Sequence, residues 1–264
     1  MPSFDLSDRV AIVTGGSQGF GKGIVLALAH QGANIAIVAR EPEAVTVGRE
    51  RPHASVLPIV DEVKTIGSRA IGITADVRDQ AQVSDMVAQA MDEYGKIDIL
   101  INVVGGSWGE TFRSGPLMEL EPEDFIECYR VNVLTGFMSS KAVQPIMKAQ
   151  GKGAIVNIAS GAGVNPGTGQ GSYGAAKAAV INMTKTMAYE WAPEIRVNSI
   201  ALGGIETPHR PMWAESTQQS SGVTQNALAR LGTPDEHAGT VLWLVSDAAS
   251  FITGECVAAD GGRH

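Results

Sequence analysis

The chain has few cysteines and aromatic residues, and it has no cluster of basic residues. Its two cysteines, Cys128 and Cys256, lie far apart without a C-x-x-C motif, so we expect reduced structural thiols and no metal site. The formal charge is −8, which argues against nucleic acids and anionic membranes as partners. No apolar run reaches the roughly 18 residues of a membrane span, and residues 1–10 do not resemble a signal peptide. We therefore expect a soluble, cytoplasmic protein that acts on a small molecule.

Short apolar runs alternate with helical patterns along the whole chain. The runs typical of buried strands are 9–14, 34–39, 69–74, 97–103, 153–159, 195–200 and 255–259. The helical patterns are 20–31, 55–67, 80–94, 121–149, 172–191 and 234–247. This alternation predicts βαβ units in an α/β fold, with a doubly wound parallel sheet and helices on both faces. With no repeat and no linker, residues 1–264 fit one domain.

A glycine-rich loop, TGGSQGFG, follows the first predicted strand and precedes the first predicted helix. Gly15 would allow the turn, Gly19 the close approach of a pyrophosphate, and Gly21 the packing of helix against strand. The helix N-terminus at this point favours an anion. The spacing is G-x-x-x-G-x-G rather than the common G-x-G-x-x-G, and a glycine turn that binds no ligand is the alternative.

Three side chains in the middle of the chain indicate acid–base chemistry. Tyr173 and Lys177 are four residues apart in YGAAK, so they share one face of a helix. An ammonium beside a phenol favours the phenolate and lowers the phenol's pKa towards neutrality. Ser160 ends the strand-like run AIVNIAS and would bring a hydroxyl to the same place. A Tyr-x-x-x-Lys alone is often a surface pair, and its weight here comes from the glycine loop.

Together these motifs resemble the short-chain dehydrogenase/reductase family, almost from end to end. The residues that resemble its cofactor site are Gly15, Ser17, Gln18, Gly19, Phe20, Gly21, Asp76, Val77, Asn102, Tyr173, Lys177, Ile205 and Thr207. The residues that match its catalytic tetrad are Asn132, Ser160, Tyr173 and Lys177. Within the cofactor set, the family would place adenine at Asp76-Val77 and would use Asn102 to stabilise the central sheet.

The resemblance implies a role for each member of the tetrad. Tyr173 would protonate a carbonyl oxygen, or deprotonate an alcohol, as hydride is transferred. Lys177 would bind the nicotinamide ribose and lower the Tyr173 pKa, and Ser160 would hydrogen-bond the substrate oxygen. Asn132 would hold a water next to Lys177. The implied protein interconverts a ketone or aldehyde and an alcohol, and is a homotetramer built through 121–149 and 172–191.

The end of the second predicted strand indicates the cofactor. An acidic residue there would bind a ribose 2′-hydroxyl and repel a 2′-phosphate, but this chain has Ala39 followed by Arg40. A guanidinium suits a phosphate, so we predict NADP(H) over NAD(H). Gln18 occupies a position that is basic in many NADP-preferring relatives, so one expected support is missing.

Several segments depart from the family pattern. Leu202-Gly203-Gly204 stands where the family has Pro-Gly, and segments 41–54 and 106–117 are longer than usual. Arg49, Arg51 and His53 are candidates for the 2′-phosphate, with a solvated loop as the alternative. Trp108, Phe112 and Arg113 are candidates for the substrate site, with packing of the loop as the alternative. Segment 205–226 is expected to close over cofactor and substrate.

Two other functions stay open. An enoyl-thioester reductase shares the fold, but some such relatives lack the Tyr of the Tyr-x-x-x-Lys pair, which is present here. A non-catalytic dinucleotide-binding regulator should show an eroded tetrad, and all four residues are present. We favour the hypothesis of a carbonyl reductase or alcohol dehydrogenase that acts on a small or medium substrate and works in the direction of reduction.

Overall fold

The computed structural model describes residues 4–40, 55–107, 111–206 and 226–263. Its sheet has seven parallel strands in the order β3-β2-β1-β4-β5-β6-β7. The strands are β1 (Val10–Thr14), β2 (Asn34–Ala39), β3 (Ala70–Thr74), β4 (Ile99–Asn102), β5 (Gly153–Ile158), β6 (Ile195–Leu202) and β7 (Cys256–Ala259). Each lies within or close to a predicted strand, and the predicted doubly wound parallel sheet is confirmed.

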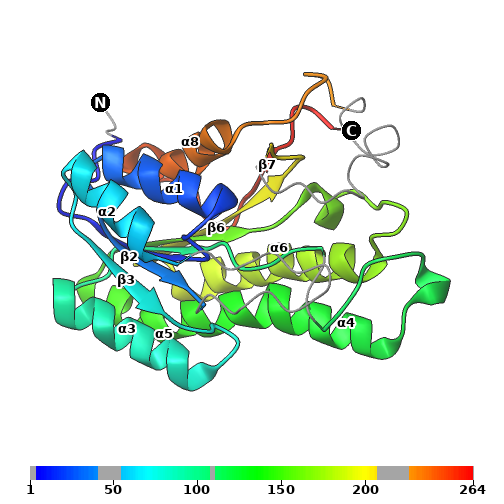
Figure 1. The fold of residues 1–264 in the computed structure, drawn as a ribbon, viewed down its shortest axis with the longest axis horizontal. Coiled ribbons are helices and arrows are strands. Elements are labelled where there is room, and N and C mark those ends of the chain that lie inside the picture. Colours follow the sequence, from blue (N-terminus) through cyan, green and yellow to red (C-terminus); the bar gives the residue numbers. More distant parts are fainter. Residues whose placement is uncertain (1–3, 41–54, 108–110, 207–225, 264) are drawn as a thin grey trace.

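Helices cover both faces of the sheet (Figure 1). The α-helices are α1 (Gly19–His30), α2 (Leu57–Ile66), α3 (Gln80–Tyr94), α4 (Pro122–Tyr129), α5 (Thr135–Gln150), α6 (Gly171–Trp191) and α8 (Pro234–Val245). The short segments are the 3-10 turns η1 (Leu117–Glu119), η3 (Gly161–Gly163) and η4 (Asp247–Ala249) and the π-helical η2 (Arg130–Leu134). One apolar core packs α1, α2 and α8 on one face, and a second packs α3, α5 and α6 on the other.

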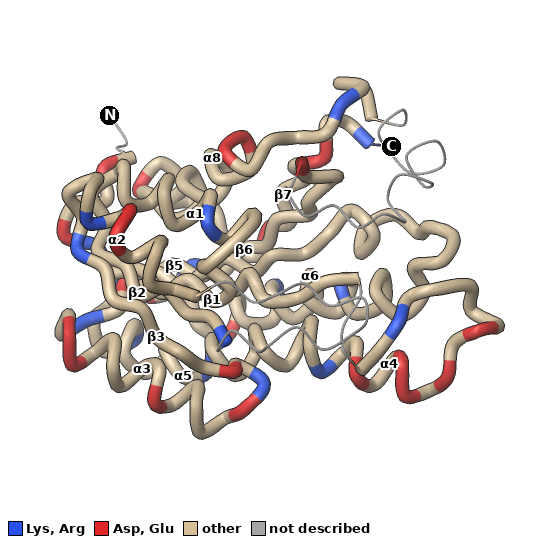
Figure 2. The backbone as a smooth tube through the Cα atoms, viewed as in Figure 1, with Lys and Arg blue, Asp and Glu red and all other residues tan. Residues whose placement is uncertain are grey.

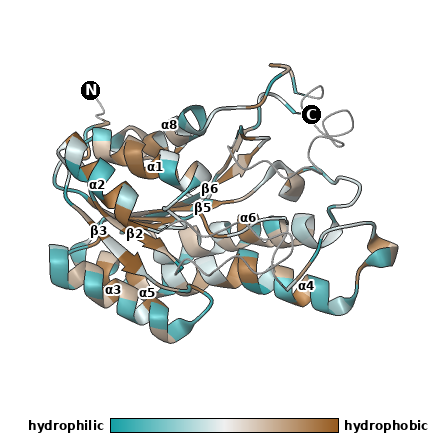
Figure 3. Cartoon of the chain, in the orientation of Figure 1, coloured by the Kyte–Doolittle hydropathy of each residue, from teal (hydrophilic) through white to brown (hydrophobic). Residues whose placement is uncertain are grey.

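The burial pattern explains why the strands form where they do. Every residue of β1, β4 and β5 is buried, as expected for strands covered on both faces. Figure 3 shows brown, apolar strands between helices whose outer faces are largely teal and polar. Because β-branched side chains fit a pleated, doubly covered strand, the sequence specifies these positions locally.

The predicted helix over 121–149 is helical throughout, but it is not regular. Its middle, η2, is π-helical and joins α4 to α5. A π-helical turn takes an extra residue, which rotates the following turns relative to the preceding ones. Asn132 lies inside η2 and is buried.

The strand order reverses between β1 and β4, so the chain leaves these two strands in opposite directions. The register aligns their carboxyl ends, with Thr14 opposite Asn102, and Asn102 opposite Asn157 of β5. Thr14 Oγ1 accepts a hydrogen bond from Val103 N at 3.2 Å across this point. The segments that follow β1, β4 and β5 therefore meet at one edge of the sheet.

Candidate active site

The glycine loop after β1 has the geometry predicted for it. Gly15 and Gly19 have φ of +72° and +54°, a region that favours glycine. A Cβ on Gly21 would lie 2.0 Å from the carbonyl oxygen of Gly15, so only glycine fits there. A Cβ on Gly19 would meet no described atom within 4 Å, which leaves the space above it open to a ligand.

The start of α1 provides unpaired backbone donors next to this space. Gln18, the N-cap, is extended and makes no side-chain capping bond, and the first turn has no acidic residue. Backbone N–H groups of a first turn have no partner within the helix, and the helix dipole favours an anion there. Ser17 is partly buried in the loop and Phe20 is buried beneath it. These residues fit the pyrophosphate of a dinucleotide.

Asp76, predicted to contact adenine, is held by an arginine that the sequence did not single out. Arg78 Nε donates to the Asp76 carboxylate at 3.0 and 2.9 Å, and Arg78 N donates at 2.9 Å. Burial acts to raise the pKa of Asp76, but the hydrogen bonds and charge of Arg78, with the charge of Arg40, hold it below its usual value. Val77 is buried in the core. Arg40 directly follows β2, so both arginines carry positive charge to this end of the site.

Asn102, predicted as part of the cofactor set, points into the core. Its Nδ2 donates to Asn157 Oδ1 at 2.8 Å and to Ser140 Oγ at 2.9 Å, so it ties β4 to β5 and α5. Asn157 continues the chain to Thr184 Oγ1 of α6 at 2.9 Å. The side chain of Asn102 therefore stabilises the sheet, as the resemblance implied.

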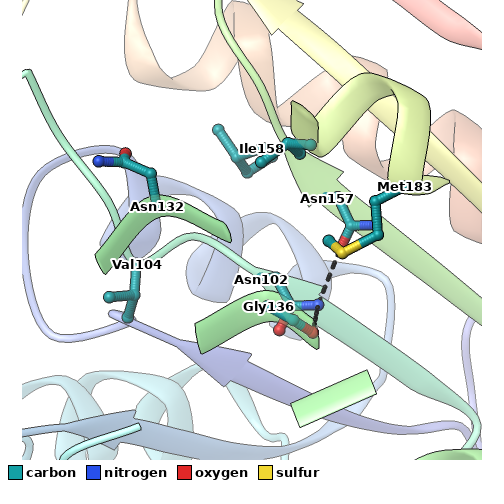
Figure 4. Close-up of a pocket in the computed structure, with 8 residues that line it drawn as sticks. Asn102, Val104, Asn132, Gly136, Asn157, Ile158 and Met183 are labelled. Carbon is teal, nitrogen blue, oxygen red and sulfur yellow. Dashed lines mark hydrogen bonds between the residues drawn. The ribbon is translucent and has the colours of Figure 1, made fainter. Parts of the chain in front are cut away.

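Figure 4 shows a small cavity between these amides and the helix that carries Asn132. The residues that line it are Asn102, Val104, Asn132, Gly136, Asn157, Ile158, Val180 and Met183. The buried Oδ1 of Asn102 has no hydrogen-bond partner among the described residues. One residue of the predicted tetrad, Asn132, is among those that line this cavity.

Asn132 is fixed by the segment that follows β4. Its Oδ1 accepts from Gly106 N at 2.9 Å, and its Nδ2 donates to Gly106 O and Cys128 O, both at 3.1 Å. Burial raises the pKa of the Cys128 thiol to about 11, so this neighbour stays protonated. Asn132 thus anchors the loop that passes over the carboxyl end of β4.

Lys177 is 3 % exposed, so its ammonium is held in the interior. Lys177 Nζ donates to the carbonyl oxygen of Ile158 at 2.8 Å. A Cβ on Gly105 would lie 2.6 Å from Asn132 Oδ1 and 3.0 Å from Lys177 Nζ, so Gly105 sits against both groups. Burial lowers the pKa of Lys177 to about 8. Gly105, which sequence reasoning missed although it ends the NVVG motif, is what lets this segment approach both groups.

Tyr173 and Ser160 meet at the start of α6. Ser160 follows β5 and its Oγ caps η3 by accepting from Ala162 N at 3.2 Å. The Ser160 hydroxyl acts to lower the pKa of the Tyr173 phenol. Burial outweighs it, so the pKa of Tyr173 is raised. The sequence predicted that Lys177 would lower the pKa of Tyr173 towards neutrality. Among the described residues this does not happen, because the effect of burial on the phenol is larger.

The far end of the segment after β4 is anchored to α4 and to the start of α6, where Ser172 Oγ donates to Arg113 O at 3.2 Å. Arg113 Nε donates to Asp124 Oδ2 at 3.2 Å, and its NH2 donates to Glu119 O at 2.7 Å. Phe112 is buried in a small core with Cys128. Phe112 and Arg113 therefore pack this segment down, and the small core that holds Phe112 also contacts Tyr173.

The exit of β6 is held by backbone pairing. Gly203 N donates to Ala259 O at 2.9 Å, and Ile205 bridges to Gly232. Ile205 is partly buried against the core. The predicted residues Thr207, Arg49, Arg51, His53 and Trp108 lie outside the described residues, as do segment 41–54 and most of 205–226.

The structure brings the four tetrad residues to the carboxyl edge of β4 and β5, next to the glycine loop. A Cβ on Gly15 would lie 3.4 Å from Val104, which precedes the Gly105 that contacts Asn132 and Lys177. The segment that follows β4, residues 103–105, therefore contacts both the glycine loop and the tetrad. A doubly wound sheet with this edge defines an α/β oxidoreductase of the class that uses nicotinamide dinucleotides.

Comparisons with known proteins identify the family. A family model described as "Enoyl-(Acyl carrier protein) reductase" matches residues 15–264. The chain is 37% identical over 261 residues to the (2S)-[(R)-hydroxy(phenyl)methyl]succinyl-CoA dehydrogenase subunit BbsD of Thauera aromatica, covering 98% of this chain and 97% of the relative. It is 33% identical to the 3-oxoacyl-[acyl-carrier-protein] reductase FabG of Thermotoga maritima, covering 97% and 98%. The chain belongs to the short-chain dehydrogenase/reductase family.

Solved structures share the whole fold. A short-chain type dehydrogenase/reductase from Mycobacterium marinum superposes with a TM-score of 0.83 at 34% identity, covering 98% of this chain and 96% of its own. A 7 alpha-hydroxysteroid dehydrogenase complexed with NADH and 7-oxo glycochenodeoxycholic acid superposes with a TM-score of 0.84 at 30% identity, covering 98% and 95%. Oxidoreduction is common to these relatives, while their substrates differ.

Two absences hold for residues 4–40, 55–107, 111–206 and 226–263. No helix among them is both long and apolar enough to span a bilayer. No three of their His, Cys, Asp and Glu side chains are grouped so as to hold a metal ion.

Proposed function

We propose that the protein is an NADP(H)-dependent oxidoreductase that interconverts a ketone or aldehyde and an alcohol, with Tyr173 as general acid and base. The observation that carries the proposal is the convergence of Ser160, Tyr173 and buried Lys177 at the carboxyl end of β5. Lys177 Nζ donates to the carbonyl oxygen of Ile158 and lies 5.7 Å from the centre of the Tyr173 ring, and Ser160 acts to lower the pKa of Tyr173. A phenol and a neighbouring hydroxyl offer two hydrogen bonds to one carbonyl oxygen. Turnover of ketones with NADPH, followed by its near-ultraviolet absorbance, tests the proposal.

Each tetrad residue has a distinct part in this proposal. A nicotinamide dinucleotide, when bound, supplies or accepts the hydride at the carbonyl carbon. Tyr173 gives its proton to the oxygen in reduction and regains one in oxidation, while Ser160 hydrogen-bonds the same oxygen. Lys177 binds the ribose hydroxyls and brings a positive charge near the phenol. Asn132 keeps the Gly106 backbone, and with it the floor of the site, in place.

Arg40 supports NADP(H) as the cofactor. It follows β2 directly, where an acid would repel a 2′-phosphate, and its charge acts on Asp76 at the same end of the site. The hydroxysteroid dehydrogenase among the similar structures was solved with NADH, so members of this fold differ in this choice. Comparing kcat/KM for NADPH and NADH decides it, and equal values or a preference for NADH would overturn this part.

An enoyl-thioester reductase is the second candidate, and the description of the matching family model favours it. The intact Tyr173–Lys177 pair favours the carbonyl reductase. NADPH consumption with ketones supports the first candidate, and consumption only with enoyl thioesters supports the second. Binding without turnover of either would indicate a regulator.

The same proposal includes a homotetramer in the cytoplasm, acting on a small molecule without nucleic acid or membrane. Phe125, Leu134 and Phe137 are partly exposed on the outer side of α4, η2 and α5. Ala175 and Ala178 are exposed on α6, whereas Ala176 is buried. Figure 2 shows Lys and Arg dispersed among Asp and Glu over the described chain. A sizing column tests the tetramer, and a monomer would refute it.

A further inference from the structure

His237, on the first turn of α8, is a buried titratable residue that the tetrad does not use. It is 6 % exposed, and its Nε2 is buried without a hydrogen-bond partner among the described residues. A buried polar atom left unpaired costs free energy, so such a residue needs an explanation. Its neighbours supply one.

The imidazole lies between the glycine loop and Gly232. On one side its ring meets Phe20 of the glycine loop edge to face, with ring centroids 6.0 Å apart and planes at 78°. On the other side Nε2 faces Gly232, where a Cβ would lie only 2.5 Å away. The contact is close enough that Gly232 can carry no side chain without moving the ring.

Gly232 is in turn bonded to the exit of β6. Its N donates to Gly204 O at 3.0 Å, and its carbonyl accepts from Glu206 N at 2.9 Å. A Cβ on Gly23 would lie 3.0 Å from Pro234, so α1 and the start of α8 are also in close contact. Figure 1 shows α1 and α8 side by side on the same face of the sheet.

We propose that His237 is a positioning residue that joins the glycine loop to the exit of β6, and that protonation of its ring weakens dinucleotide binding in mild acid. The neutral ring fits between Phe20 and Gly232. A protonated ring would carry a charge in a buried place, packed between Phe20 and the Cα of Gly232. The ring would have to move, and the first turn of α1 and the strand pairing at Gly232 would move with it.

The charges around the ring set the direction of the effect. Burial lowers the pKa of His237 below its ordinary value of 6.5, while the Gly204 carbonyl and the charge of Glu236 act to raise it. Glu236 is itself bound to Arg230 at 2.7 Å, and the other charged residues on the elements packed against the ring are Asp235 on α8, Glu206 after β6 and Lys22 on α1, which is paired with Glu62 at 2.7 Å. The ring is thus neutral at neutral pH, and acid is required to charge it.

The test follows dinucleotide binding and turnover between pH 8 and pH 5.5 in the wild type, His237→Leu and His237→Gln. His30→Gln is the matched control, because His30 is an exposed histidine at the C-terminal end of α1, the helix that carries Phe20. In the wild type the KM for the dinucleotide, and its Kd by fluorescence, should rise reversibly by roughly threefold to tenfold as the pH falls, with little change in the KM for the carbonyl substrate. Both His237 variants should lack this rise, and His30→Gln should keep it.

The proposal rests on dinucleotide binding, so binding of NADPH or NADH is first measured at pH 8. Binding of neither refutes the proposed function itself. Binding with the same pH profile in wild type and His237 variants refutes the role of His237 alone. Should the variants fail to fold, imidazole NMR titration of the wild type decides. The pKa of His237 should be lower with the dinucleotide bound than without it. A ring pKa that the dinucleotide does not change overturns the proposal.

Discussion

Lys177 Nζ lies 5.7 Å from the centre of the Tyr173 ring and is bonded instead to the carbonyl oxygen of Ile158, at 2.8 Å. The two side chains share a helix face, and the ammonium lies over the phenol ring while it donates its hydrogen bond to the end of β5. Both groups are desolvated, which raises the pKa of Tyr173 and lowers that of Lys177. We therefore expect acid–base chemistry of Tyr173 at neutral pH to depend on an additional charge between the phenol and the Lys177 ammonium.

Tyr173→Phe should abolish turnover, with kcat lowered by at least about 10²-fold, because the proton donor is removed. Dinucleotide affinity should be nearly unchanged, since the ring remains. Tyr189→Phe is the control: Tyr189 is on the same helix and 88 % exposed, so its loss should not matter. Steady-state kinetics and a fluorescence titration measure both quantities, and an active Tyr173→Phe enzyme would rule out Tyr173 as the acid.

Lys177→Met should lower kcat and weaken dinucleotide binding while making the protein more stable at pH 7. Holding this charge in the core lowers its pKa from 10.5 to about 8, which corresponds to a cost of the order of 3 kcal/mol. An apolar chain of similar length removes that cost and loses one hydrogen bond, so we expect a net gain of about 1 kcal/mol in the free energy of unfolding. Chemical denaturation measures it, with the exposed Lys185→Met as control; unchanged cofactor affinity would refute the ribose role.

The same residue gives a pH dependence with a definite sign. Between pH 8 and 10.5 the unfolded Lys177 holds its proton while the folded one has released it. The unfolded state then binds more protons, so the wild-type free energy of unfolding gains a contribution that rises with pH across this window. Subtracting the Lys177→Met profile isolates this contribution. A difference that is flat or falls with pH would show that Lys177 is not desolvated as described.

Arg40→Asp should shift the cofactor preference towards NADH. The change removes a cation from the end of β2 and adds a carboxylate that repels a 2′-phosphate and accepts a ribose 2′-hydroxyl. We expect the ratio of kcat/KM for NADPH to that for NADH to fall by about 10²-fold, the scale of losing a charge-assisted contact. Arg69→Asp, on an exposed arginine paired with Glu93 at 2.6 Å, is the control. If both variants keep the wild-type ratio, another residue reads the phosphate.

Alanine at Gly19 and at Gly21 should fail in different ways. At Gly21 the new Cβ would lie 2.0 Å from Gly15 O, so the loop must distort and the melting temperature should fall by several degrees. At Gly19 there is room for a Cβ among the described atoms, and the positive φ costs about 1 kcal/mol, so stability should fall less. Dinucleotide affinity should fall in both. A Gly19→Ala protein that binds normally would show that no ligand approaches there.

The strands could be predicted because their signal is local. In β1, as in β5, every side chain is apolar or buried, and a short β-branched run between turn residues is specific for a strand covered on both faces. The placement of Tyr173 and Lys177 on one helix face could be predicted for the same reason, since they are one helical turn apart. The π-helical turn at Asn132 was not, because the periodicity of 121–149 does not show where one extra residue is inserted.

The partners of charged and polar side chains could not be predicted either. Arg113 was a candidate for an anionic substrate, but it is bound to Asp124. Arg78 and Gly105 were not singled out, although each is close to a predicted site residue. Such pairings are made between segments that the fold brings together, and no spacing along the chain records them.

By itself, the sequence determined the parallel sheet, the glycine loop after β1 and the phenol–ammonium spacing, since each depends on residues within one or two turns of one another. The tertiary structure alone decided where the Lys177 ammonium is directed, how desolvation sets the pKa values of Tyr173 and Lys177, and that His237 lies between Phe20 and Gly232. The physical reason is that burial and electrostatic environment are properties of a place in the folded molecule, to which distant segments contribute.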